Sequence, residues 1–177
     1  MRIALRSSIY LLIIILGGLI LRLGLLSFIH NPGLNDQNHY YNLGQRLVHG
    51  QGFTIDYVWH YSRVPDDIVH PIDHWMPLAG VAVAVGMTLG GETPQGALTL
   101  FILAGTMLPL LVFLATTQLN GSDSAALIAA VFGAVLPDVV WNSLRTDTTI
   151  LNMVFITASV LLLNYGLQKN RWWAFVL

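Results

Sequence analysis

Long apolar stretches separated by polar connections dominate the chain. Four of them are predicted to cross a membrane as helices, over about residues Ile9–Ile29, Gln95–Leu119, Ala125–Val140 and Thr149–Leu167. At about 1.5 Å per helical residue, the first covers the roughly 30 Å hydrocarbon core of a bilayer. Another apolar run begins at Trp172 and stops after six residues. A span needs about 20 residues, so we expect the sequence to end inside a fifth span.

One polar stretch, residues 30–94, interrupts this pattern. All six histidines lie between His30 and His74, and Asn35–Leu78 carries five of the nine acidic residues. Ionisable side chains are energetically costly in lipid, so membrane proteins carry them mainly where function requires them. We therefore expect the protein to perform its chemistry or its recognition in this loop.

The loop is predicted to begin with a short helix from Asp36 to about His49. Asn35 or Asp36 can cap its start, and Gly50 can end it. Three apolar residues recur on one face at helical spacing: Tyr40, Leu43 and Leu47. This pattern predicts an amphipathic helix that lies on the membrane surface.

The segment Trp75–Gly91 is apolar, but its length of 17 residues and its Pro77 favour an interfacial or re-entrant segment over a span. If it does not cross, Arg2 and Lys169 both fall in the cytoplasm, as positively charged flanks generally do. We therefore expect a multi-pass protein of the cell (inner) membrane with a cytoplasmic N-terminus. The polar loop and the connection Trp141–Thr148 would then share the outer face.

Composition supports an all-α membrane protein with several spans. The chain is 55% apolar and only 10% charged, whereas soluble domains average about 25% charged residues. The net charge of −1 argues against nucleic acid as a partner. Arg2 and Arg6 before an apolar run also occur in signal peptides. However, the first run has 21 residues against the usual ~7–15, which favours an uncleaved span.

Several charged residues have both a structural and a functional interpretation. Asp36 can cap the loop helix or act as a base, and Asp147 can cap the helix that begins at Thr149 or serve a site. Arg22 can snorkel to the outer interface or bind a lipid phosphate. Arg46 can meet lipid phosphate with or without a role in catalysis.

Histidine and aromatic residues add further candidates. His70, Asp73 and His74 stand at helical spacing that can bind zinc, although loop histidines also serve as interfacial hydrogen-bonding groups. Tyr40 and Trp75 can stack on a sugar or belong to an interfacial aromatic belt. The sequence therefore leaves open whether the protein binds a divalent metal, and it does not identify a cofactor. The absence of cysteine excludes thiolate ligands and disulfides.

The order of residues in the loop resembles a known family. An Asp soon after the first span, a Tyr-x-x-Leu-Gly, a Gly-x-Gly-Phe turn and the segment HPIDHWMPL are similar to the GT-C membrane glycosyltransferases. Within that group, the protein O-mannosyltransferase-like and aminoarabinose-transferase-like enzymes are the most similar. A second likeness is Pro137 followed by Ser143 and Arg145-Thr-Asp147, which resembles the family's other Asp-bearing outer loop. The matching loop residues are Asp36, Tyr40, Leu43, Gly44, Gly50, Gly52, Phe53, His70, Pro71, Trp75 and Pro77.

The resemblance implies an inverting glycosyltransferase that moves a sugar from a polyprenyl-phosphate donor to a glycan, lipid or protein acceptor on the outer face. Asp36 matches the family's general base, and Asp147 matches the second acidic residue near its active site. Members typically run to several hundred residues, so the resemblance implies a GT-C-like bundle cut short after its N-terminal portion. We expect the substrates to contact Arg22, Tyr40, Arg46, His70, His74, Trp75 and Arg145.

Two other interpretations remain open on the sequence. The chain can be a small non-catalytic membrane subunit whose polar loop binds a partner or lipid. It can also be a metal-dependent membrane hydrolase that uses the loop histidines. Transfer from a polyprenyl-phosphate sugar would favour the glycosyltransferase, and sensitivity to chelators would favour the hydrolase.

Overall fold

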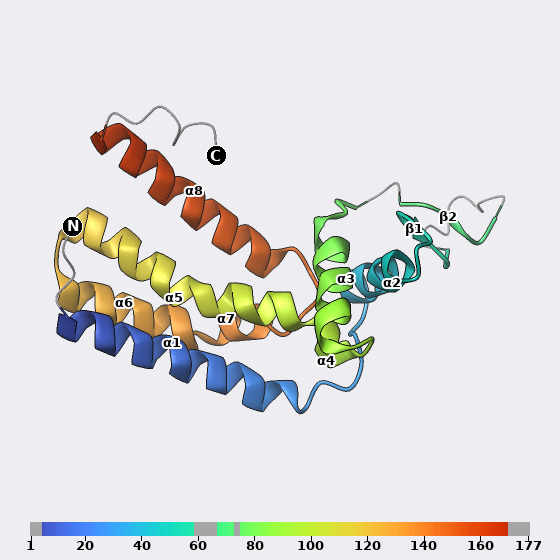
Figure 1. Cartoon of the computed structure of the whole chain (residues 1–177), viewed down its shortest axis with the longest axis horizontal. Coiled ribbons are helices and arrows are strands. Elements are labelled where there is room, and N and C mark those ends of the chain that lie inside the picture. The colour runs from blue at the N-terminus through green and yellow to red at the C-terminus, as the bar shows by residue number, and fades with distance from the viewer. Residues whose placement is uncertain (1–4, 59–66, 73–74, 170–177) are drawn as a thin grey trace. The chain divides into compact units, whose positions relative to one another are not determined.

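The computed structural model describes residues 5–58, 67–72 and 75–169, which are mostly helical (Figure 1). The elements in chain order are α1 (Leu5–Leu26), α2 (Asp36–Val48), β1 (Thr54–Ile55), β2 (His70–Pro71), α3 (Leu78–Gly90), α4 (Pro94–Ala97), α5 (Thr99–Asn120), α6 (Asp123–Val135), α7 (Pro137–Asn142) and α8 (Thr149–Lys169). They form two compact units. The bundle unit contains residues 5–24, 102–143 and 149–169, and the loop unit contains residues 25–101 and 144–148.

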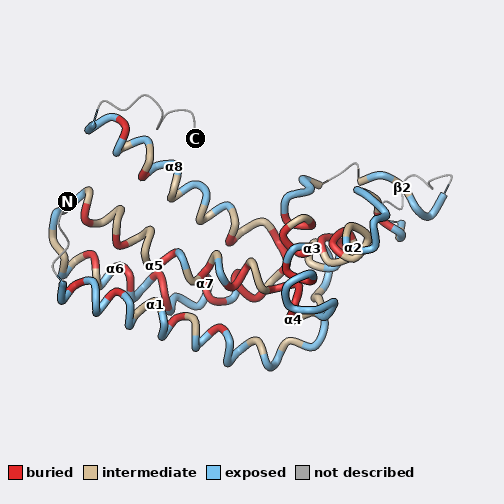
Figure 2. Tube along the Cα trace, in the orientation of Figure 1, coloured by how far each residue is buried: buried red, intermediate tan, exposed pale blue. Residues whose placement is uncertain are grey.

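Three helices of the described chain, α1, α5 and α8, are long and apolar enough to cross a membrane. The apolar helices α3 and α6 are shorter. Figure 2 shows that much of α1 and α8 is exposed, and their exposed residues include large apolar ones such as Ile20 and Phe155. Apolar surface on this scale is unusual for a protein in water. The protein is therefore membrane-associated, as the hydropathy pattern predicts.

Contacts within the bundle unit fix the directions of its helices. The Ser7 hydroxyl donates to Asp123 Oδ2 over 2.6 Å, and Arg22 Nη1 donates to the Ala134 carbonyl oxygen over 3.0 Å, so α1 and α6 run the same way. Phe113 of α5 packs with Leu11 of α1, and the start of α5 lies beside the end of α1, so α5 runs the opposite way. Which end of the bundle unit is cytoplasmic stays a prediction.

Small residues allow the bundle helices to approach closely. Leu11, Phe113, Ala126 and Ala130 form a buried cluster between α1, α5 and α6. A Cβ added at Gly133 of α6 would lie 3.4 Å from the Cα of a proline in α5. Packing of this kind supplies much of the association energy of helices in a bilayer, where lipid is as apolar as the side chains.

The structure divides two of the four predicted spans. The stretch predicted as one span over Ala125–Val140 contains α6 and α7, which are separated at Leu136. Pro137 explains the break, because it lacks the N–H that would continue the helical ladder and its ring clashes with the preceding turn. The stretch Gln95–Leu119 falls within α4 and α5, and Thr93 caps α4 by accepting from the Gly96 N–H over 3.0 Å.

In the loop unit, the predicted helix after Asp36 is confirmed as α2, but its apolar face does not lie open for a membrane surface. Tyr40 and Leu43 are buried. An added Cβ at Gly44 would lie 2.7 Å from Val83 Cβ of α3, and one at Gly80 of α3 would lie 2.6 Å from Leu43 Cγ. Glycine on both helices thus permits a close contact, and α3 covers the face that the sequence assigned to lipid.

Candidate functional site

The start of α2 and the segment Leu144–Thr148 meet in the loop unit, although they are more than a hundred residues apart in sequence. The Thr146 hydroxyl donates to the backbone carbonyl oxygen of Gln37 over 2.9 Å. Thr146 is almost fully buried. Because Gln37 follows Asp36 and Thr146 precedes Asp147, this bond brings the two predicted catalytic carboxylates to the same part of the unit.

The charges of both carboxylates act on the Tyr40 side chain. Its side chain is 2% exposed, one helical turn after Asp36 on α2. Burial raises the pKa of the Tyr40 phenol, and the negative charges of Asp36 and Asp147 raise that pKa further. The Thr146–Gln37 hydrogen bond places the segment that carries Asp147 beside the start of α2, where Asp36 and Tyr40 lie. The predicted site residues Asp36, Tyr40 and Asp147 are therefore brought together.

The two carboxylates have different surroundings. Asp147 is almost fully buried, and its Oδ2 lies 3.2 Å from Nε of Arg145 in an ion pair. Asp36 is half-buried in the first turn of α2, and its carboxylate accepts no hydrogen bond from the described part of the chain. The capping role is not observed, because Asn35 occupies the N-cap position and no side chain caps the helix. Of the two carboxylates, Asp147 is thus the one engaged in an ion pair within the described residues.

A buried histidine, His39, extends this site. It is 1% exposed and follows Asp36 by three residues, so both lie on one face of α2. Its Nδ1 and the Tyr57 hydroxyl are 2.6 Å apart and hydrogen-bonded. The rings of Tyr40 and Tyr57 meet the His39 ring edge-on, with centroids 5.4 and 6.1 Å away, and the Trp75 ring lies 6.4 Å away.

The tyrosines of this region are held in their neutral form. Burial raises the pKa of Tyr57, and Asp36 and Asp56 add to the effect. Burial also raises the pKa of Tyr41, with a smaller effect from Glu92.

Sequence reasoning missed His39 as a site residue. Its helical spacing from Asp36 is the signal that could have found it.

Other predicted site residues lie elsewhere in the loop unit. Arg46 Nε donates to Thr54 Oγ1 over 2.6 Å, and Arg46 Nη1 lies 3.3 Å from Asp56 Oδ2. Arg46 is ten residues beyond Asp36 on α2, which corresponds to about 15 Å along the axis. It therefore ties α2 to β1 and is not part of the Asp36 group.

His70 lies on β2, which pairs antiparallel with β1 in the register Ile55 to His70. Its Nδ1 donates to the Ile68 carbonyl oxygen over 3.0 Å. His74 and Asp73, its predicted partners, lie outside the described residues. Across residues 5–58, 67–72 and 75–169, no group of three histidine or acidic side chains is placed to hold a metal ion.

Arg22 belongs to the bundle unit, where it is 0% exposed. Its Nη1 donates to the carbonyl oxygens of Gly18 and Ala134 over 2.9 and 3.0 Å, and its Nε donates to Ser143 Oγ over 3.1 Å. A Cβ at Gly105 would lie 3.0 Å from that Nε, so glycine makes room for the guanidinium.

Complete burial rules out the interpretation of Arg22 as a snorkelling residue. Its second terminal nitrogen, Nη2, is buried without a hydrogen-bond partner in the described chain. No carboxylate among these residues lies within ion-pairing distance of it. Contact between Arg22 and a lipid phosphate stays a prediction, because the bonds described here are all to neutral oxygens.

Comparisons of the chain with protein-family models, curated proteins and solved structures found no match.

Proposed function

We propose that the protein is a membrane glycosyltransferase of the GT-C type, which moves a sugar from a polyprenyl-phosphate donor to an acceptor hydroxyl. The observation that carries the proposal is the pair of unlike carboxylates beside Tyr40. Asp147 is paired with Arg145, while Asp36 is half-buried with no hydrogen bond from the described chain. The family resemblance supports the same two residues.

In the proposed reaction, Asp36 accepts the proton of the acceptor hydroxyl as its oxygen attacks the anomeric carbon of the sugar. The bond between that carbon and the phosphate oxygen breaks, and polyprenyl phosphate leaves with the electron pair. Attack from the face opposite the leaving group inverts the anomeric configuration. A carboxylate acting in this way typically contributes about 10²–10⁴ to the rate.

Asp147 has a different part in this proposal. Its ion pair with Arg145 orients the guanidinium, and the Arg145 side chain remains one-third exposed. Arginine binds phosphate oxygens through paired N–H groups. Arg145 is thus suited to balance the charge that develops on the leaving phosphate, and Asp147 is its positioning residue.

Aromatic rings suit this site to a sugar. The Tyr57 and Trp75 rings beside His39 are partly exposed and supply apolar surface, and the Tyr57 hydroxyl is a fixed polar group hydrogen-bonded to His39. Apolar surface combined with a few fixed polar groups is typical of small-molecule sites.

Asp36→Asn tests the assignment of the base. We expect transfer by the native gene product, assayed in its own membrane, to fall by about 10²–10⁴-fold while expression is unchanged. Asp67→Asn is the matched control, because Asp67 is an exposed aspartate of the same unit. Unchanged turnover in the Asp36 variant would reject the base, and the non-catalytic interpretation of the loop would then be preferred.

A further inference from the structure

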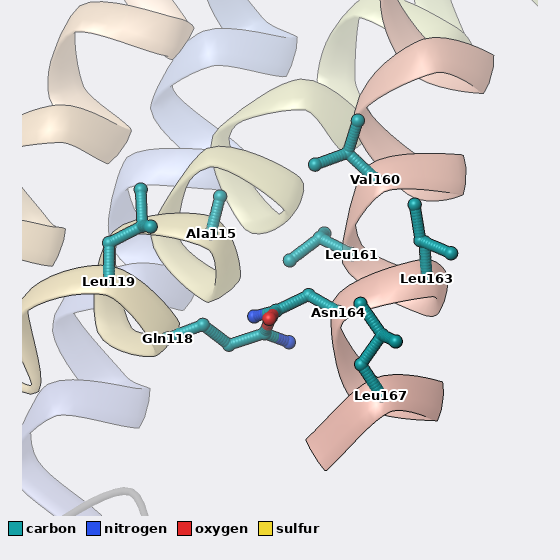
Figure 3. Close-up of a pocket in the computed structure, with 8 residues that line it drawn as sticks. All are labelled: Ala115, Gln118, Leu119, Val160, Leu161, Leu163, Asn164 and Leu167. Atoms are coloured by element: carbon teal, nitrogen blue, oxygen red, sulfur yellow. The ribbon is translucent and has the colours of Figure 1, made fainter. Parts of the chain in front are cut away.

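A groove of about 260 Å³ lies between α5 and α8 in the bundle unit (Figure 3). Ala115 and Leu119 of α5 line one side, and Val160, Leu163 and Leu167 of α8 line the other. Its surface is almost entirely apolar. The groove belongs to the bundle unit and the carboxylates belong to the loop unit, and the proposed glycosyl transfer does not use the groove.

One polar pair crosses the groove and joins its two walls. Asn164 Nδ2 donates to Gln118 Oε1 over 2.5 Å, and Figure 3 shows the two side chains pointing toward one another. The pair satisfies much of its own hydrogen-bonding capacity, so the remaining lining presents hydrocarbon. It also holds the walls together. A helix packs with its axis about 8–10 Å from each neighbour, so no helix can enter between walls that are directly bonded.

The occupant is therefore a narrow apolar chain. Both walls belong to helices that are long and apolar enough to cross a membrane, and their outward residues Leu119, Val160 and Leu167 are exposed. Empty apolar space loses the dispersion contacts of its lining. In a bilayer, the acyl chains of lipids are the narrow molecules available to restore those contacts.

A cation marks the end of the groove. Lys169 is the last residue of α8 and stands two residues, or about 3 Å along the axis, beyond Leu167. It is exposed and makes no ion pair within the described chain. A long lysine side chain at a helix end can extend to the headgroup region while its stem covers apolar surface.

We propose that the α5/α8 groove binds an acyl chain of an anionic membrane phospholipid, whose phosphate pairs with Lys169. The lipid fills the groove and holds α8 against α5. This assignment gives α8 additional packing, since α8 buries only 17% of its most apolar window. The groove residues belong to the bundle unit, whereas Asp36 of the proposed transfer belongs to the loop unit.

The test is to purify the chain from vesicles containing equal amounts of phosphatidylcholine and phosphatidylglycerol, and to count retained lipids by native mass spectrometry. We expect one retained lipid per chain, with phosphatidylglycerol preferred by about fivefold, the effect of one lysine near a membrane surface. Lys169→Gln should remove that preference. Arg6→Gln is the matched control, because Arg6 is an exposed cation on α1 at the same end of the bundle unit.

Filling the groove tests the acyl-chain contact directly. Ala115→Leu should lower lipid retention by about tenfold, whereas Ala104→Leu should not. Ala104 lies on the same helix 11 residues away, which is close to three turns and therefore on the same face. Should Ala115→Leu fail to fold, as judged by its helical circular dichroism, Val160→Phe fills the groove from the α8 side.

Four results would overturn the proposal. They are no retained lipid, equal loss in the two alanine variants, equal retention of both phospholipids by the unmodified chain, and displacement of phosphatidylglycerol by equimolar polyprenyl phosphate. The last would assign the groove to the donor. Loss of sugar transfer in the Asp36 variant with unchanged lipid retention would separate this site from the proposed active site.

Discussion

The bond between Arg22 and Ala134 leads to a quantitative prediction about a helix break. In a continuous helix, the Ala134 carbonyl would accept from the backbone N–H four residues later. Pro137 ends α6 before that turn can form, and the carbonyl instead accepts from Arg22 Nη1 over 3.0 Å. We expect Arg22 to donate to a carbonyl oxygen that the helix break at Pro137 leaves without a backbone donor. The perturbation is therefore a double-mutant cycle of Arg22→Met and Pro137→Ala.

The cycle is needed because single substitutions of Arg22 mix opposing effects. Arg22→Met leaves buried oxygens unsatisfied, at a cost of about 1–3 kcal/mol for each, but it also removes a buried charge that is itself costly. These effects occur in both backgrounds and largely cancel in the cycle. What remains is the coupling. Hydrogen bonds between membrane helices are worth about 0.6–2 kcal/mol, so Arg22→Met should cost about 1 kcal/mol less when residue 137 is alanine.

The assay is reversible unfolding of the four proteins in mixed detergent micelles, followed by helical circular dichroism. Pro109→Ala supplies the control cycle. Pro109 also lies within a membrane helix, α5, but makes no bond with Arg22. That pair should be additive within about 0.3–0.5 kcal/mol. Additivity of the Arg22 and Pro137 substitutions within the same limit would show that the Arg22–Ala134 bond does not depend on Pro137.

Three further predictions concern packing and pH. Because the pKa values of the tyrosines are raised in the folded state, their contribution to the free energy of unfolding should be complete below about pH 10. It should fall as the pH rises further, because the folded state keeps protons that the unfolded chain releases. Unfolding measured between about pH 9 and 12 would show no such loss if these pKa values were ordinary. Gly44→Ala should destabilise the protein by about 1–3 kcal/mol, whereas Gly17→Ala should not, because no atom lies within 4 Å of its added Cβ. Equal thermal midpoints of the two variants would contradict the close contact of α2 with α3. Phe113→Ala should lower the free energy of unfolding by about 3–5 kcal/mol and Phe155→Ala by much less, because Phe113 is fully buried and Phe155 is exposed. Similar losses for the two variants in chemical unfolding would contradict the placement of Phe113 in the core.

Local signals in the sequence predicted the helical elements well. The apolar runs indicated α1, α5 and α8, and Asp36 with Gly50 marked the limits of α2 within about two residues. These features follow from hydropathy and turn chemistry, which act over a few neighbouring residues. The break at Pro137 was also visible locally, but the apolar run on both sides was interpreted as a single span.

Features that depend on distant contacts were not accessible in the same way. The apolar face of α2 predicts burial, but the pattern does not distinguish a lipid surface from α3, whose Gly80 admits Leu43. Likewise, Arg22 finds its acceptors on α6 and beyond, and His39 finds Tyr57 across a turn. The approach of Asp147 to Asp36 was expected from membrane topology and the family resemblance, not from spacing along the chain.

Sugar transfer by the native gene product is the direct test of the proposed glycosyltransferase activity. Membranes containing the native gene product would receive polyprenyl-phosphate sugars labelled at the anomeric carbon, and the configuration of the product would be read by nuclear magnetic resonance. We expect transfer to an acceptor hydroxyl with inversion at that carbon, lost in the Asp36→Asn variant and kept in Asp67→Asn. Transfer with retained configuration, or equal transfer by membranes that lack the gene product, would contradict it.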